Sequence, residues 1–325
     1  MTKKTLLSGV KPSGRPHIGN FFGAMKQFAD LQESHHCMIF IPDYHALTTT
    51  QNRDEMRQNI LDVAIDYLAI GLDPKKVLIY KQSDIPEHTE LAWIFETITT
   101  MPYLMRAHAF KDAEARSKEI NAGVFNYPLL MAADILLYDA DLVPVGHDQK
   151  QHIEIARDTA EKFNHIFGET FKLPEGLILD NVKTVPGIDG QKMSKSYGNT
   201  IPLFASDEEI KKAVMSIVTD SASPAEASAK EGGGVPKNVY AIHELVRDKT
   251  SLEALYEEKK GKYKDLKEAL IEDLIAFIKP MREKRESIAS DIESVKNILR
   301  EGGAKARAKA QSKMEIVREK IGVKL

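Results

Sequence analysis

Short, unbroken apolar runs alternate with longer amphipathic segments along the first half of the chain. The runs lie at residues 5–10, 38–41, 77–80, 142–146 and 177–179. Runs of this length, bounded by turn-forming residues, are typical of parallel strands that are buried on both faces. With helices between them, they predict an α/β domain built on a doubly wound, Rossmann-like parallel sheet with right-handed crossovers.

The segments between these runs have apolar residues at helical spacing. Three of them read as amphipathic helices, at residues 18–31, 54–69 and 151–163. From residue 89 to about 115 the pattern is also helical. We expect the stretch from Gly123 to Pro128 to break that helix and a new helix to begin at Leu129. These segments together predict a helical insertion at about 89–140.

Beyond residue 203 the pattern becomes entirely helical and rich in charge. Helices are expected at residues 208–218, 239–246, 252–256, 262–279 and 288–321, and residues 222–236 read as a glycine-containing linker. We therefore predict two domains, an α/β domain at 1–202 and an α-helical domain at 203–325.

The composition of the 325 residues narrows the possible classes of protein. A net charge of −3 means that any contact with nucleic acid has to come from a local basic patch. Cys37 is the only cysteine, which rules out an internal disulfide and a zinc site of paired cysteines. We see neither a signal peptide nor a membrane-length apolar stretch, and we expect a cytoplasmic protein.

Polar residues follow the predicted strands where doubly wound sheets bind their ligands, outside the carboxyl ends of the strands. They are Ser13, His17, Asp43, His45 and Gln82, which are site candidates by position. The first strand, a tight loop and a helix start form an arrangement that favours phosphate, because backbone N–H groups and the helix dipole point at the ligand.

Gly19 and Gly23 lie inside the first predicted helix, where a glycine costs about 1 kcal/mol relative to alanine. We expect both glycines to allow the close approach of a ligand or of neighbouring backbone.

Asp134 is a carboxylate in an otherwise apolar predicted helix. Its apolar neighbours are Leu130, Met131, Leu137 and Tyr138. We expect Asp134 to be buried, and a buried carboxylate must be hydrogen-bonded or paired. These residues alone favour a structural bond to nearby backbone or to a hydroxyl, and a ligand-binding role is the alternative. Asp148 and Gln149, which follow the fourth strand, suit contacts to ribose hydroxyls or an amino group.

Two basic segments are candidates for binding phosphate groups. Residues 192–196, Lys-Met-Ser-Lys-Ser, lie between turn formers and could close over a polyphosphate, although a solvated surface turn is equally compatible with these five residues. Residues 301–325 carry seven basic and three acidic residues, a net charge of +4. An RNA backbone could lie on this segment, and a solvated helix face is the alternative.

Together these stretches resemble the class I aminoacyl-tRNA synthetases, in which a Pro…His-Ile-Gly-His-type loop and a Lys-Met-Ser-Lys-Ser loop bracket ATP. The first motif is here Pro12…His17-Ile18-Gly19-Asn20, with Asn20 in place of the last histidine, and residues 192–196 match the second motif at every position. Within the class, the chain is most similar to the bacterial tryptophanyl-tRNA synthetases. The matching stretches are residues 8–14, 131–138, 143–152 and 213–221.

The resemblance implies a reaction. The tryptophan carboxylate would attack the α-phosphorus of ATP, whose phosphates hold Mg²⁺, to give tryptophanyl-adenylate and pyrophosphate. The aminoacyl group would then pass to tRNA(Trp). No covalent enzyme intermediate is needed and the protein itself holds no metal site, so we expect residues that clamp the reactants. The resemblance also implies a homodimer, a catalytic nucleotide-binding domain at 1–202 and a tRNA anticodon-binding domain at 203–325.

The same resemblance implies roles for the residues on the ATP side. His17 and Asn20 would hold phosphate or ribose oxygens, and Gly19 would let adenine lie against the backbone. Lys192 and Lys195, with Ser194, would close on the pyrophosphate and stabilise charge in the transition state, and Lys111 would assist. The other ATP-binding residues that it implies are Lys11, Pro12, Ser13, Gly146, His147, Asp148, Val185, Met193 and Ser196.

On the amino-acid side, Asp134 would accept the indole N–H. A buried acceptor can discriminate by a factor of order 10⁴ against a substrate that lacks the donor. The other tryptophan-binding residues that the resemblance implies are Gly9, His45, Tyr127, Met131, Val143, Val145 and Gln149. Three positions depart from the usual pattern, where Leu7 replaces an aromatic residue, Lys11 a glutamine and His147 a glutamate.

Two other functions stay open at this point. The first is a tyrosyl-tRNA synthetase, although the tyrosine and aspartate pair that recognises a phenol hydroxyl is not found in place of residues 132–135. The second is an RNA-binding paralogue that no longer charges tRNA, against which the intact lysine and histidine motifs count.

Overall fold

The computed structural model describes residues 3–115, 120–146, 150–177, 185–218 and 236–325. They form two compact units, each assembled from separate stretches of the chain. The first unit comprises residues 1–14, 27–180 and 291–325, and the second comprises residues 15–26 and 181–290. The functional boundary that the sequence places at residue 203 stays a prediction.

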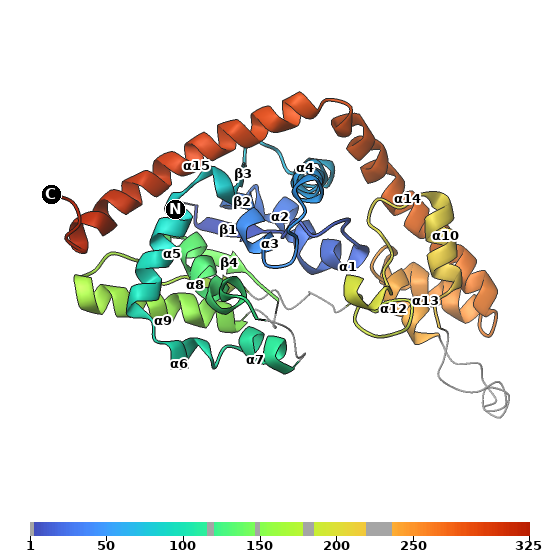
Figure 1. Cartoon of the computed structure of the whole chain (residues 1–325). Helices are drawn as coiled ribbons and strands as arrows, with labels where there is room; N and C mark the ends of the chain where they lie inside the picture. The colour runs from blue at the N-terminus through green and yellow to red at the C-terminus, as the bar shows by residue number, and fades with distance from the viewer. Residues whose placement is uncertain (1–2, 116–119, 147–149, 178–184, 219–235) are drawn as a thin grey trace. The chain divides into compact units, whose positions relative to one another are not determined.

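A parallel five-stranded sheet forms the centre of the first unit (Figure 1). Its strands are β1 (Thr5–Gly9), β2 (His36–Ile41), β3 (Leu78–Lys81), β4 (Leu142–Pro144) and β5 (Glu175–Leu177). Their spatial order is β3-β2-β1-β4-β5, with every pair parallel, which confirms the doubly wound sheet. The order reverses between β1 and β4, so ligands are expected at the carboxyl ends of these two strands.

The first strands are buried in the way their apolar sequences predict. Leu6 and Ile39 are completely inaccessible to solvent, and Ile79 is 1% exposed. β1 and β2 approach so closely at Gly9 that a Cβ atom there would lie 2.6 Å from the Phe40 carbonyl oxygen. The buried Tyr67 hydroxyl closes this end, because it donates to the same carbonyl at 2.9 Å and accepts from the Val10 N–H at 2.6 Å.

Helices cover the sheet in the first unit. They are α3 (Asp43–Ala46), α4 (Arg53–Ala69), the 3₁₀ turn η2 (Gln82–Asp84), α5 (Glu87–Ile98), α6 (Met101–Leu104), α7 (His108–Ala115), α8 (Ala122–Leu136), α9 (Lys150–Phe167) and α15 (Ile292–Lys320). Helices α5 to α8 form the helical insertion that the sequence predicts between β3 and β4. Within the described part of the chain, no helix has both the length and the apolar character needed to cross a membrane.

The predicted helix break at Gly123–Pro128 is wrong. Helix α8 begins at Ala122 and runs through Pro128 to Leu136. The side chain of Asn121 caps its start by accepting from the Val124 N–H at 2.9 Å. A proline inside a helix costs about 3 kcal/mol, and burial of the apolar face of α8, including Pro128 itself, offsets that cost.

Helix α15 packs against β3 through a stripe of small residues (Figure 1). Gly302, Gly303, Ala306 and Ala310 are buried on this face. Gly302 allows the closest approach, because a Cβ atom there would collide with the Ile79 carbonyl oxygen. The contact explains why residues 291–325 join the first unit although they follow the helices of the second.

Replacing Gly302 with alanine is expected to destabilise the protein by about 1–3 kcal/mol, because the added methyl group forces α15 away from β3. Gly303→Ala is the matched control, since its Cβ would meet the Asp84 carboxylate at an ordinary 3.4 Å. Urea unfolding of the two variants measures the difference. Equal midpoints would contradict the close packing at Gly302.

Much of the basic charge in residues 301–325 is used within the first unit. Arg307 pairs with Glu87 at 3.3 Å, and Arg318 pairs with Glu90 at 2.6 Å. Lys313 pairs with Asp139 at 2.7 Å. These ion pairs attach α15 to α5 and to the segment after α8. RNA binding by this segment stays a prediction.

Helices dominate the second unit. They are α10 (Asp207–Met215), α12 (Lys237–His243), α13 (Lys249–Glu258) and α14 (Tyr263–Ala289). The sequence ends the last of these at Lys279, before Pro280, but α14 continues to Ala289. Pro280 and Ala276, whose carbonyl loses its helical partner, both lie on the exposed face, where water can satisfy that carbonyl.

The helix predicted at 18–31 has three parts, α1 (Ile18–Asn20), the π-helical turn η1 (Phe21–Met25) and α2 (Lys26–Leu31). A Cβ atom at Gly19 would lie 2.9 Å from Nδ1 of the His17 ring, so a side chain rather than neighbouring backbone approaches this glycine. A Cβ atom at Gly23 would meet nothing within 4 Å, and the approach of a ligand to either glycine stays a prediction.

Candidate active site

Helix α8 presents the carboxylate of Asp134 to the interior of the first unit. Asp134 is 1% exposed, so the burial that the sequence predicts is confirmed. Helical spacing places Tyr127, Met131 and Asp134 on one face of α8. The side chains of this face are therefore available to a single pocket.

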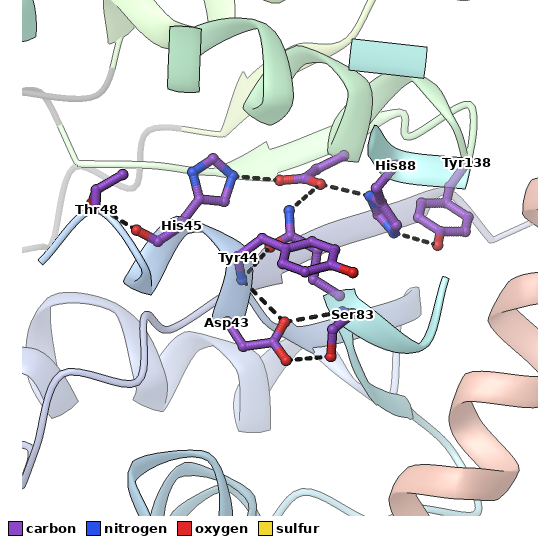
Figure 2. A network of polar contacts seen from close by, with 9 residues as sticks. Asp43, Tyr44, His45, Thr48, Ser83, His88 and Tyr138 are labelled. Atoms are coloured by element: carbon purple, nitrogen blue, oxygen red, sulfur yellow. Dashed lines mark hydrogen bonds and ion pairs between the residues drawn. The ribbon is translucent and has the colours of Figure 1, made fainter. Parts of the chain in front are cut away.

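Three side chains bond the Asp134 carboxylate. His45 Nε2 lies 2.8 Å from Oδ2, and Gln82 Nε2 and His88 Nδ1 lie 2.7 Å and 2.6 Å from Oδ1. Figure 2 shows His88 facing the Tyr138 hydroxyl on its other side, at 2.9 Å from Nε2. The partners differ in kind from the backbone or hydroxyl groups that the sequence alone favours.

The partners of Asp134 decide its protonation state. Burial opposes the charged form, but the hydrogen bonds from His45 and His88 and their electrostatic attraction outweigh it, so the pKa of Asp134 is lowered from its ordinary value of 3.8. Asp134 is therefore a carboxylate at neutral pH, with acceptor atoms only.

A second carboxylate, Asp43, fixes the elements that carry these partners. Asp43 Oδ1 accepts from the Ser83 N–H at 3.0 Å, and Oδ2 accepts from the Ser83 hydroxyl (Figure 2). The Tyr44 N–H donates to Gln82 Oε1 at 3.1 Å, which orients the Gln82 amide with its NH₂ toward Asp134. Helix α3 and turn η2 are thus held together, and with them His45 and Gln82. His45 and Gln82 follow the carboxyl ends of β2 and β3, where the sequence predicts site residues.

The other predicted tryptophan-binding residues also belong to the first unit. His45 and Tyr127 lie edge to face, with ring centroids 6.1 Å apart. Val143 is in the core, and Met131 and Val145 pack against that core while partly buried. Gly9 ends β1, next to β4 in the sheet. Gln149 lies outside the described residues.

A cleft of about 350 Å³ adjoins His45 and Tyr127. Its other walls come mainly from α5 and α8 and include Trp93, Glu96 and Asn126. Asp134 and Met131 are not among the residues that line it. The cleft therefore borders the predicted tryptophan pocket on its His45 side and is distinct from the Asp134 end.

Sequence reasoning missed His88 and gave Tyr138 no role beyond its place in a helix. His88 lies in the first turn of α5, shortly after β3, whereas the predicted helix begins at residue 89. Its position past a strand end was the available signal, since the same rule selected His45 and Gln82.

The histidine of the first motif begins α1 in the second unit. His17 Nδ1 accepts from the Asn20 N–H at 3.2 Å, and Asn20 Oδ1 accepts from the His17 N–H at 3.1 Å. Asn20 thus closes a capping box, the arrangement that the sequence does not reveal. Burial, with the charge of Lys195 as a second cause, lowers the pKa of His17 to about 4. His17 is therefore neutral at pH 7, with Nδ1 as acceptor and Nε2–H as donor.

The loop at residues 192–196, which we call the lysine loop, is organised by the buried Asn199, which follows it in the sequence. Asn199, 1% exposed, accepts from the Ser194 N–H at 2.8 Å and donates to Asp189 Oδ1 at 2.8 Å and to the Lys192 carbonyl at 3.2 Å. Met193 is buried, and its N–H bonds the Val185 carbonyl at 2.9 Å. Lys192 and Lys195 are exposed on this scaffold.

Replacing Asn199 with alanine is expected to lower the rate of adenylate formation about 10-fold and the free energy of unfolding by about 1–3 kcal/mol, because two backbone groups of the loop lose their partner. Stopped-flow measurement of the chemical step and hydrogen exchange of residues 192–198 test this. Tyr197→Phe, an exposed change in the same loop, is the control. Unchanged exchange of the loop in the Asn199 variant would contradict the assignment.

The remaining residues that are predicted to bind ATP differ in their burial and in their hydrogen bonds. Lys11 is half buried, which lowers the pKa of its ammonium group, and it bonds the Thr48 hydroxyl at 3.2 Å. Pro12 is buried, Ser13 is exposed, and Lys111 is exposed on α7. Ser196 bonds the Ser194 hydroxyl at 2.9 Å, and Gly146 follows β4. His147 and Asp148 lie outside the described residues.

The chain is similar to known proteins in both its sequence and its fold. The family described as tRNA synthetases class I (W and Y) matches residues 2–279. A relative from Fusobacterium nucleatum, named Tryptophan--tRNA ligase, is 47% identical over 98% of this chain and 98% of its own length. A relative of the same name from Rhodopirellula baltica is 46% identical over 98% of this chain and 99% of its own.

The chain is also similar in fold to solved structures of tRNA synthetases. The tryptophanyl-tRNA synthetase of Campylobacter jejuni, complexed with ADP and tryptophan, has a TM-score of 0.89 at 43% identity and covers 98% of this chain and 99% of its own. A tyrosyl-tRNA synthetase from Archaeoglobus fulgidus, at 22% identity and a TM-score of 0.68, covers 87% of this chain and 90% of its own and shares the fold.

Proposed function

The chain belongs to the class I tRNA synthetases of the tryptophan and tyrosine group, and from this premise we propose which of its residues perform the activity. The activity is that of a tryptophan--tRNA ligase, which uses ATP to activate tryptophan as tryptophanyl-adenylate and then transfers the aminoacyl group to tRNA. The reaction splits ATP between its α- and β-phosphates, so the protein has to position a carboxylate and stabilise a departing pyrophosphate.

The observation that carries the tryptophan-specific assignment is the buried, ionised carboxylate of Asp134. An ionised carboxylate is an acceptor, and the indole N–H is the polar group that distinguishes tryptophan from other large apolar side chains. Met131, Val143 and Val145 supply apolar surface for the ring, and His45 and Tyr127 supply polar edges. A substrate without the N–H would leave Asp134 with an unpaired lone pair in a buried site, which is costly.

On the ATP side, the proposed roles follow from charge and protonation state. The neutral His17 has a donor at Nε2 that suits a phosphate oxygen, and Lys192 and Lys195 supply positive charge on a loop that can close. Lys11, Gly146 and Val185 are proposed as further contacts, with Lys111 assisting. Among the described residues, no group of three histidine, cysteine or carboxylate side chains could hold a metal ion. We also propose that Mg²⁺ is bound through the ATP phosphates, where it would neutralise charge.

The wider assignments are also proposals. We propose tRNA(Trp) as the acceptor, a homodimer as the working form and the cytoplasm, where tRNA is charged for protein synthesis, as the location. Residues 1–202 would carry catalysis and residues 203–325 would recognise the anticodon. Sedimentation with and without tRNA tests the dimer and its partner together.

Amino-acid-dependent exchange of pyrophosphate into ATP tests the function. Exchange is expected with tryptophan and not with tyrosine, followed by charging of tRNA(Trp). Exchange with tyrosine instead would favour a tyrosyl-tRNA synthetase, and tRNA binding without exchange for any amino acid would favour an RNA-binding paralogue.

A further inference from the structure

His88 is completely buried between two polar groups, the carboxylate of Asp134 and the hydroxyl of Tyr138. Its Nδ1 lies 2.6 Å from Asp134 Oδ1, and its Nε2 lies 2.9 Å from the Tyr138 hydroxyl. The ring also stacks on Phe40, with an interplanar angle of 20° and centroids 6.3 Å apart. Both ring nitrogens are thus engaged, and the ring plane is fixed by packing.

The partners of His88 determine where its proton lies. Asp134 is a carboxylate and can only accept, so Nδ1 has to carry a hydrogen. In the neutral ring, Nε2 is then the acceptor, and the Tyr138 hydroxyl donates to it. Tyr138 therefore selects the tautomer of His88 that donates to Asp134.

Counting lone pairs gives the consequence for the carboxylate. Each carboxylate oxygen has about two acceptor sites. Gln82 and His88 together occupy those of Oδ1, whereas His45 alone bonds Oδ2. One acceptor site of Oδ2 is thus left for a further donor, and His88 prevents the carboxylate from rotating to present Oδ1 instead.

We propose that His88 is a positioning residue for tryptophan selection: it donates to Asp134 Oδ1 and thereby directs Oδ2 to the indole N–H. The inference rests on the proposed role of Asp134 and extends it to a residue that does not touch the substrate. Tyr138 acts one step further away, by holding the tautomer.

The charged and titratable groups around Asp134 set the expected pH dependence. They are His45 on α3, His88 on α5, Tyr138 after α8 and Tyr80 on β3, and Glu87 on α5 acts in turn on Tyr138. Loss of the Nδ1 donor removes a stabilising contact of the carboxylate and raises the pKa of Asp134. Because tryptophan needs the ionised form, its binding should then weaken at a higher pH than in the unchanged protein.

Two amide substitutions test the roles of the two ring nitrogens of His88 independently. In His88→Asn the amide nitrogen occupies the place of Nδ1 and can still donate to Asp134. In His88→Gln the amide reaches the place of Nε2, next to Tyr138, and the donor to Asp134 is lost. The two variants therefore have similar polarity and opposite effects on the carboxylate.

The experiment compares exchange of pyrophosphate into ATP with tryptophan and with an analogue whose indole N–H is replaced by sulfur, β-(benzothiophen-3-yl)alanine. His88→Gln is expected to lower the preference for tryptophan by about 10- to 100-fold. It should also raise the pH below which tryptophan binding, measured by calorimetry, becomes weaker. His88→Asn should restore most of both properties, and Tyr138→Phe should lower the preference by a smaller factor.

Each outcome has a separate meaning. An unchanged preference in His88→Gln, or equal losses in the two amide variants, would overturn the positioning role and leave His88 as a packing residue. If His88→Gln does not fold, Tyr138→Phe provides the test. An unchanged preference for tryptophan over the analogue, together with an unchanged pH dependence of tryptophan binding, would then overturn the proposal. Absence of tryptophan-dependent exchange in the unchanged protein would instead refute the proposed function.

Discussion

Replacing Asp134 with alanine is expected to lower kcat/KM for tryptophan in adenylate formation by a factor of about 10³–10⁴. The indole N–H then has no acceptor in a buried site, and the donors of His45, Gln82 and His88 lose theirs. ATP does not contact Asp134 in the proposed arrangement, so its affinity should change little. Exchange kinetics measure the first quantity, and calorimetric titration with ATP measures the second.

Asp134→Asn separates recognition from folding. Asparagine has the same shape, and its amide oxygen can accept from Gln82 and His88, so the fold should be retained. The amide NH₂ then takes the place of Oδ2 and opposes the indole N–H, donor against donor. We expect nearly the same loss for tryptophan as in the alanine variant, with a smaller loss for an analogue that lacks the N–H. Unchanged tryptophan affinity in Asp134→Asn would contradict the assignment.

Replacing Lys195 with alanine is expected to slow adenylate formation by a factor of about 10²–10³ while tryptophan affinity stays the same. The ammonium group is needed where negative charge develops on the departing pyrophosphate, which is a property of the transition state. Single-turnover measurement of the chemical step, set beside calorimetric binding of tryptophan, distinguishes the two effects.

Lys211→Ala is the matched control for Lys195, because Lys211 is an exposed lysine of the same unit on α10. Loss of positive charge there should leave the chemical step unchanged. His17 provides an internal check on the Lys195 variant. Burial is the larger cause of its lowered pKa, so without Lys195 the pKa of His17 should rise but His17 should remain neutral at pH 7. A Lys195 variant impaired in tryptophan affinity alone would contradict the proposed role.

The sequence was a good guide to the elements and to positions at strand ends. Apolar runs located β1 to β4, and the rule that ligands sit past the carboxyl ends of strands selected Asp43, His45 and Gln82. The structure places His45 and Gln82 on Asp134 and bonds Asp43 to the neighbouring Ser83, whereas Ser13 and His17, which the same rule selected, are not among the described partners of Asp134. The same rule applies to the position of His88 after β3, but it could not reveal the bond to Asp134, because the distance between the two residues depends on how α5 packs against α8.

Prolines show the opposite case, where local preference was overruled. Pro128 and Pro280 were expected to end helices, and both lie inside one. Packing of α8 offsets the cost at Pro128, and solvent satisfies the freed carbonyl at Pro280. Asn20 and Asn199 are a different case, because their capping box and hydrogen bonds are made to residues nearby in the chain but depend on a backbone conformation that their sequence does not reveal.

By itself, the sequence determined the fold class, the order of strands and helices, and the two motifs that indicate adenylate chemistry. These features are local, because periodicity and turn residues act over short stretches of chain. The tertiary structure decided the return of residues 291–325 to the first unit, the ionised state of Asp134 and the neutral state of His17. Such properties arise from burial and from hydrogen bonds between residues far apart in sequence, which no local pattern encodes.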